Sequence, residues 1–153
     1  MKPIKGTKWL RKGRHDSLGL YYVLTAVTVG RQPLLENPNA ALAVLSTMRW
    51  LDANDRITLE VGVVMPDHFH MVVRREEKSI SIVMHSLKGY SAKRINQACG
   101  RSGTVWQHGY HDHAVRNDED LNEIIRYCLN NSVRAGLVED FHLYPYWYCR
   151  YKV

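Results

Sequence analysis

Hydrophobic positions along this chain recur with two periods, and the changes between them divide it into seven predicted elements. Runs of aromatic and β-branched residues are typical of strands, whereas apolar residues at every third or fourth position are typical of helices. The predicted strands cover residues 20–29, 57–64, 68–74 and 111–116. The predicted helices cover residues 40–53, 80–98 and a stretch from about 118 to just before Gly136. This order predicts an α+β fold: a ferredoxin-like or RRM-like split βαβ sheet with helices on one face and an added C-terminal helix.

Residues at the element ends and inner faces sharpen this prediction. Residues 30–38 are interpreted as a loop with proline breakers, and Leu42 opens the apolar stripe of the helix that follows. Gly100 is placed to cap the second helix at its C-terminus. The acidic residues 118–120 are expected in the first turn of the last helix, where negative charge is favourable.

Length and composition indicate one domain spanning residues 1–153. Hydrophobic residues make up 45% and charged residues 24% of the sequence, as in ordinary globular proteins. No apolar run is long enough for a membrane span, and the N-terminus lacks the apolar region of a secretory signal, so a cytoplasmic location is expected. The three cysteines are odd in number and widely spaced, which argues against a disulfide framework or a zinc knuckle.

The positive charge is concentrated at the N-terminus. The formal net charge is +6, and six basic residues precede Asp16, the first acid. Residues 1–17 therefore form a basic arm, suited to phosphate contact and, through Trp9, to base stacking; a solubilising tail is the alternative. The predicted nucleic-acid contacts are Lys5, Lys8, Arg11, Lys12, Arg14, Lys88, Arg94, Arg116 and Arg134. Residues 141–153 form an aromatic tail that packs back or extends this surface.

The segment His68-Phe69-His70 is the first candidate for chemistry. Because side chains alternate along a strand, His68 and His70 share one face and Phe69 points to the other. Their Cα atoms are about 6 to 7 Å apart on a strand, which lets both imidazoles reach one divalent ion. The alternative interpretation is a pair of exposed strand histidines.

Tyr127 and Asn131 are the second candidate. Their spacing of four places both side chains on one side of the last helix, with Tyr127 well away from the centre of its apolar stripe. The phenol would then be free, and Asn131 could supply an oxygen as a third metal ligand. A surface tyrosine on the helix flank is the alternative.

Phosphoryl chemistry joins the two candidates. A phenol with a pKa near 10 is a poor nucleophile, and a divalent ion that clamps the phosphate would orient the phosphorus for in-line attack. Phosphate oxygens together with two imidazoles suit Mg²⁺ or Mn²⁺.

Four ordered motifs resemble one known family. They are VMPDHFHMVV at residues 64–73, HSLKGY at 85–90, VWQHGYHDHAVR at 105–116 and YCLNNSVRAGLV at 127–138. Together they resemble the HUH single-strand DNA transposases with one catalytic tyrosine, which include the IS200/IS605-like and the REP-associated tyrosine transposases. The chain departs from the family pattern at Ser132, where relatives often have proline, and at Cys128, which replaces a larger aliphatic residue.

The resemblance implies a function and a site. His68 and His70 would bind the metal, Asn131 would be the third ligand, and Tyr127 would attack single-stranded or hairpin DNA. Such enzymes leave a 5′-phosphotyrosine and a free 3′-OH, and they occur as monomers and as homodimers.

Three alternatives stay open on the sequence. Tyr90 is a rival nucleophile, although its position beside Leu87 and Ser91 favours packing in the core. His111 and His113 form a second alternating pair, interpreted as structural or DNA-facing. The chain as a whole could be a non-catalytic single-strand binder or a metallohydrolase that uses activated water, and Trp106 could stack on a base or lie in the core.

Overall fold

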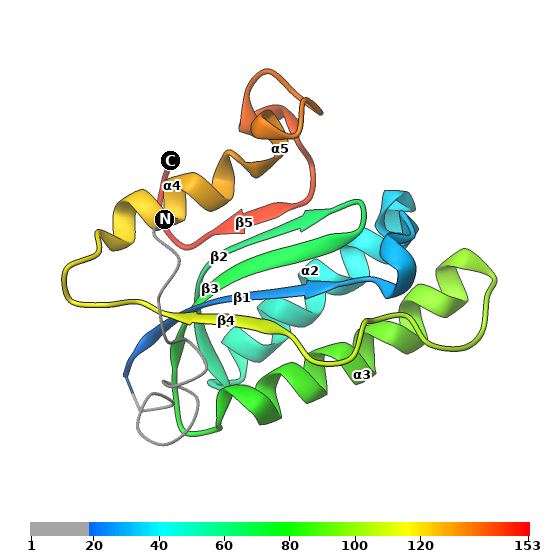
Figure 1. Ribbon diagram of the computed structural model, residues 1–153, viewed down its shortest axis with the longest axis horizontal. Coiled ribbons are helices and arrows are strands. Elements are labelled where there is room, and N and C mark those ends of the chain that lie inside the picture. Colours follow the sequence, from blue (N-terminus) through cyan, green and yellow to red (C-terminus); the bar gives the residue numbers. More distant parts are fainter. Residues whose placement is uncertain (1–18) are drawn as a thin grey trace.

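The computed structural model describes residues 19–153, and the basic arm of residues 1–17 lies outside this range. A five-stranded antiparallel sheet in the order β4-β1-β3-β2-β5 forms its middle layer. Helices α2 and α3 cover one face, and α4 with the short α5 covers the other (Figure 1). The strands are β1 (Tyr21–Val27), β2 (Ile57–Met65), β3 (His68–Arg75), β4 (His111–Ala114) and β5 (Trp147–Cys149). The helices are α2 (Pro38–Ala53), α3 (Ile80–Cys99), α4 (Leu121–Leu129) and α5 (Asn131–Arg134), and 3-10 turns occupy Val29–Arg31, Leu34–Glu36 and Phe141–Leu143. The predicted α+β fold is confirmed.

The central strand β3 contributes to two separate cores. Phe69 and Met71 are fully buried against α2 and α3, and Phe69 meets the Trp106 ring edge-on at 5.3 Å. Trp106 is therefore a core residue, and its indole N–H donates to Ser91 Oγ at 3.1 Å. The alternate residue Val72 packs with α4 on the other face. Because successive side chains point to opposite faces, His68 and His70 lie on the α4 side.

Helix α4 covers the second face through a short apolar stripe. Its buried residues are Ile124, Ile125, Cys128 and Leu129, as the sequence predicts, and they pack on valines of β1, β2 and β3. The helix begins at Leu121, with Asp120 as N-cap accepting from the backbone of Asn122 and Glu123. The prediction that residues 118–120 form its first turn is therefore wrong. The predicted helix up to Gly136 is also interrupted at Asn130, where α5 follows.

Two details of the first predicted helix are corrected as well. The helix begins at Pro38, inside the predicted loop, because the Asn37 side chain accepts from the backbone of Asn39 and Ala40 and proline fits the first helical position. Leu42 is 50% exposed, while Val44 and Ala41 fill the core in its place. The predicted cap at Gly100 is confirmed by its left-handed backbone, with φ of 62°.

The aromatic C-terminal segment packs back on the sheet. Residues Trp147–Cys149 pair with Val61–Val63 of β2 as the fifth strand, which the periodicity does not predict. The Tyr144 hydroxyl donates to the Val64 carbonyl at 2.5 Å, and burial raises the pKa of Tyr144 to about 12. Within residues 19–153, no helix has the length and apolar character needed to cross a membrane.

Gly62 of β2 lies close against Met48 of α2 and gives a test of this packing. A Cβ atom at this position would lie 2.6 Å from the sulfur of Met48, which is fully buried. We expect Gly62→Ala to lower the free energy of unfolding by about 1 to 3 kcal/mol, measured by urea denaturation. Gly89→Ala is the matched control, since nothing lies within 4 Å of its Cβ position on α3, and it should stabilise by about 0.5 to 1 kcal/mol. Equal stability of Gly62→Ala and the unmodified protein would contradict the tight packing.

Candidate functional site

His68 and His70 lie side by side at the start of β3. The strand follows a tight turn at Pro66 and Asp67, with Met65 of β2 paired to His68. The two imidazole rings have centroids 4.8 Å apart in an edge-on arrangement. Both side chains are partly buried on the sheet face that α4 covers. The predicted sharing of one face is therefore confirmed.

Each imidazole is held through its Nδ1 atom. His68 Nδ1 donates to the Asp67 carboxylate at 2.6 Å, and His70 Nδ1 lies 2.7 Å from the hydroxyl of Thr25 on the neighbouring strand β1. Arg31 in turn binds Asp67 at 3.2 Å. Within residues 19–153, neither Nε2 atom has a hydrogen-bond partner, and the Nε2 lone pair is free in the tautomer that carries its proton on Nδ1, as the Asp67 carboxylate requires at His68. Metal-binding histidines characteristically have this arrangement, in which an outer partner fixes the ring through the other nitrogen.

The electrostatics keep His70 neutral. Burial, followed by the charges of His68 and Arg134, lowers the pKa of His70 from 6.5 to about 4. Partial burial alone would raise the pKa of Asp67, but the hydrogen bond and charge of His68, together with Arg31, hold it below its ordinary value. A neutral imidazole is the form that coordinates a cation, whereas the protonated form repels it.

Tyr127 projects from the flank of α4. Its side chain is 50% exposed, and its neighbour Cys128 is buried in the second core, where burial raises the thiol pKa to about 12 despite the charge of Arg134. The Arg134 guanidinium carbon lies 3.5 Å from the centroid of the Tyr127 ring. The same guanidinium donates to the Tyr127 carbonyl at 2.6 Å. The charge of Arg134 also lowers the pKa of His70, after burial and the charge of His68, and opposes the raised pKa of Cys128.

Asn131 begins α5, one turn beyond Tyr127. Its amide nitrogen is buried and has no hydrogen-bond partner within residues 19–153. Rotation of the amide by half a turn would present the oxygen at the same position, so this orphaned group fits a cation ligand. No cluster of three or more His, Cys, Asp or Glu side chains in the described chain could hold a metal. The predicted ligand set, two imidazoles and this amide, contains only two residues of these types.

The second histidine pair separates into two roles. His113 is buried, with Nε2 at 3.0 Å from both carboxylate oxygens of Glu119, which also accepts from the Arg116 backbone. These contacts fasten the loop that leads into α4, so His113 is structural. His111 is exposed, and the register places it opposite Thr25 in the row that contains His70. It therefore lies on the same sheet face as the histidine pair.

The rival tyrosine lies elsewhere. Tyr90 is 56% exposed, so its predicted packing in the core is wrong: it occupies the flank of α3, beside the buried line through Leu87 and Ser91. Helix α3 covers the opposite face of the sheet from His68 and His70. Tyr90 is thus separated from the histidine pair by the sheet.

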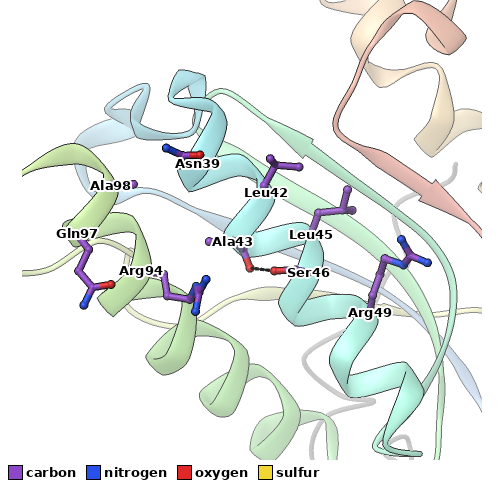
Figure 2. A pocket seen from close by; sticks show the side chains of 9 residues that line it. All are labelled: Asn39, Leu42, Ala43, Leu45, Ser46, Arg49, Arg94, Gln97 and Ala98. Carbon is purple, nitrogen blue, oxygen red and sulfur yellow. Dashed lines mark hydrogen bonds between the residues drawn. The ribbon is translucent and has the colours of Figure 1, made fainter.

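A hollow of about 530 Å³ between α2 and α3 lies on that opposite face (Figure 2). Arg94 reaches into it from α3, and Arg49 lines it from α2. Arg94 also binds the Tyr90 hydroxyl at 3.3 Å. The hollow therefore holds none of the candidate catalytic residues.

The predicted nucleic-acid contacts are dispersed. Lys88 donates to the carbonyls of Gln107 and Gly109, at 2.8 and 2.6 Å, and so ties α3 to the segment before β4. Arg116 pairs with Asp118 at 3.4 Å in the loop before α4. Arg134 stands beside Tyr127, whereas Lys5, Lys8, Arg11, Lys12 and Arg14 lie outside the described residues. Among the described cations of this set, only Arg134 contributes to the lowered pKa of His70.

Sequence reasoning missed three partners in the site. Asp67 directly precedes His68 in the sequence, and this adjacency was the available signal for their contact. Thr25 is 45 residues from His70, and nothing in the local pattern of β1 marks it. The ring contact of Arg134 spans seven residues across the break between α4 and α5, and its spacing of two helical turns was the available signal.

Comparison with known proteins identifies the family of this chain. The sequence model described as "Transposase IS200 like" matches residues 17–131. The chain belongs to the IS200-like transposase family. That match covers both histidines, Tyr127 and Asn131.

Individual members of this family are similar over part of the chain. A REP-associated tyrosine transposase of Escherichia coli is 28% identical over 90 residues, which are 58% of this chain and 52% of the relative. A Haemophilus influenzae protein assigned to the same group is 27% identical over 94 residues, 54% of this chain and 53% of that protein. The matches thus span about half the length of these relatives. The solved structure of a REP-associated tyrosine transposase bound to a REP hairpin has a TM-score of 0.69 at 21% identity, and covers 96% of this chain and 82% of that one.

The lowered pKa of His70 predicts a pH-dependent stability. The unfolded chain takes up a proton near pH 6.5, whereas the folded protein does so only near pH 4, so stability falls as the pH drops between these values. We expect His70→Gln to reduce the loss of unfolding free energy between pH 7 and pH 4.5 by about 1 to 2 kcal/mol, measured by urea denaturation. His111→Gln is the control for an exposed histidine on the same face. Identical pH slopes for His70→Gln and the unmodified protein would contradict the buried neutral imidazole.

Proposed function

We propose that this IS200-like family member cleaves and rejoins single-stranded DNA, with Tyr127 as the nucleophile. The observation that carries the proposal is the pair of inward-held imidazoles, each with a free Nε2, on the sheet face that the tyrosine-bearing helix covers. The half-exposed phenol of Tyr127 is accessible to a strand at this face, whereas Tyr90 lies behind the sheet. The names of the relatives, which are tyrosine transposases, support the same chemistry.

The covalent step is a transesterification that conserves the phosphodiester energy. The phenolic oxygen of Tyr127 attacks the phosphorus, an O–P bond forms, and the bond from phosphorus to the O3′ atom breaks. The phenol loses its proton and the departing O3′ gains one, which gives a 5′-phosphotyrosine and a free 3′-OH. Attack by a 3′-OH on the phosphotyrosine reverses the step, so rejoining needs no ATP.

His68, His70 and Asn131 are the residues that would hold a divalent cation. Neutral imidazoles and an amide oxygen beside phosphate oxygens suit Mg²⁺ or Mn²⁺, with Mn²⁺ better matched to nitrogen. Such an ion supplies charge neutralisation and orientation of the phosphate. Asp67 and Thr25 contribute by holding the two rings through their Nδ1 atoms.

The DNA partner is proposed from chemistry and from likeness. A REP-associated tyrosine transposase of the same fold was solved with a REP hairpin, and we propose single-stranded or hairpin DNA as the partner here as well. The basic arm would add phosphate contacts, which weaken as salt rises. This protein would act on such DNA as a monomer or a homodimer.

Replacement of the phenol tests the nucleophile. We expect Tyr127→Phe to abolish the covalent adduct with a labelled hairpin oligonucleotide library in Mn²⁺, because the attacking oxygen is gone while the ring is retained. The assay is a denaturing gel followed by sequencing of the trapped strands. Tyr90→Phe is the matched control and should retain the adduct. Cleavage by Tyr127→Phe would indicate attack by water, and binding without any adduct by the unmodified protein would indicate a non-catalytic binder.

Titration calorimetry with Mn²⁺ tests the metal ligands independently of activity. We expect His68→Ala or His70→Ala to abolish binding, and Asp67→Asn to weaken it by roughly 10- to 100-fold, since the amide no longer draws the Nδ1 proton as strongly. His111→Ala controls for a histidine on the same face that is not a ligand. Unchanged Mn²⁺ affinity in both histidine variants would contradict the site.

A further inference from the structure

The geometry points to Arg134 as the residue that positions the Tyr127 phenol for attack. This inference rests on the proposed function, because it assigns a role around the proposed nucleophile. Arg134 would then orient the Tyr127 ring, whereas the sequence predicts that it contacts the nucleic acid.

Little else in the described structure fixes the Tyr127 ring. The ring leaves the flank of α4 half exposed, while the apolar stripe of the helix turns toward the sheet. No hydrogen bond to its hydroxyl is formed within residues 19–153. A nucleophile must keep a defined approach to phosphorus, and a tyrosine held only by its backbone would sample several rotamers.

Arg134 constrains this ring from two directions. Its guanidinium carbon stacks at 3.5 Å from the ring centroid, and its Nη1 donates to the Tyr127 carbonyl at 2.6 Å. That carbonyl is in the last turn of α4, where backbone acceptors lack partners in the helix and are often satisfied by a basic side chain. One planar group therefore caps the helix and covers one face of the phenol at the same time.

The break between α4 and α5 makes this arrangement available. Asn130 separates the two helices, and Arg134 is the last residue of α5, seven positions beyond Tyr127. The guanidinium reaches back over the break to the ring and the carbonyl of Tyr127. Arg134 therefore lies where it can hold the phenol at the C-terminal end of α4, the helix that covers the sheet face of the histidine pair.

A lysine could supply the charge but not the planar contact. Arginine stacks on a ring while its N–H groups remain in plane to donate, whereas an ammonium is a point charge on a flexible stem. Arg134→Lys thus retains the charge and loses the clamp, and Arg134→Gln loses both. Arg126 offers the matched control, since it is exposed on the same helix next to Tyr127, whereas the guanidinium stacked on that ring belongs to Arg134.

The decisive experiment separates the rate of adduct formation from DNA affinity. Single-turnover adduct formation is measured in Mn²⁺ with saturating protein and a hairpin oligonucleotide whose sequence was recovered from the library assay above. DNA affinity is measured separately in the absence of metal. We expect Arg134→Gln to slow adduct formation on the order of 10- to 100-fold with unchanged DNA affinity, and Arg134→Lys to fall between it and the unmodified protein. Arg126→Gln should keep the full rate.

A second readout follows the ring itself. The protein is labelled with 3-fluorotyrosine, and the signal of residue 127 is assigned as the one that Tyr127→Phe removes. This ¹⁹F resonance should move toward that of free 3-fluorotyrosine in Arg134→Gln and stay in place in Arg126→Gln. A full rate of adduct formation in Arg134→Gln, a loss confined to DNA affinity, or an unmoved resonance would each overturn the positioning role. An adduct formed by Tyr127→Phe would instead remove the proposed function, and the role of Arg134 with it, so the two failures are distinguishable.

Discussion

The strict two-residue alternation of β3 is the constraint on which the rest of this structure depends. Phe69 is fully buried beneath α2 and α3, and this fixes the register of the strand between β1 and β2. His68 and His70 must then point to the opposite face. A slip of one residue would exchange the two faces, expose Phe69 and bury both imidazoles in the larger core, so the hydrophobic effect holds the candidate site in place.

The same register supplies the outer contacts of the imidazoles. Thr25 is opposite His70 because β1 and β3 pair antiparallel, and the turn before β3 places Asp67 beside His68. Their hydrogen bonds leave both Nε2 atoms free, and partial burial keeps His70 neutral. The arrangement of the two proposed metal ligands thus arises from ordinary sheet pairing and the turn before β3.

The second face of the sheet carries Tyr127, the proposed nucleophile, because α4 is amphipathic over a short length. Its stripe packs on valines of three strands, and Tyr127 remains on the flank, where Arg134 covers the ring. The interruption at Asn130 and the fastening of the preceding loop by His113 and Glu119 fix where this helix begins and ends. Family membership and these contacts support one chemistry, cleavage and rejoining of a DNA strand through a phosphotyrosine.

The sequence by itself determined the order of elements, the shared face of His68 and His70 and the flank position of Tyr127, because these follow from local periodicity. It did not determine the start of α4, the break at Asn130 or the strand Trp147–Cys149, since capping contacts and pairing with a distant strand decide them. It placed Tyr90 in the core, although the spacing of side chains on α3 leaves that ring exposed. Only the tertiary structure brought Thr25 to His70, because a contact between distant segments depends on strand register, and only the structure showed Arg134 stacked on the Tyr127 ring across the break at Asn130.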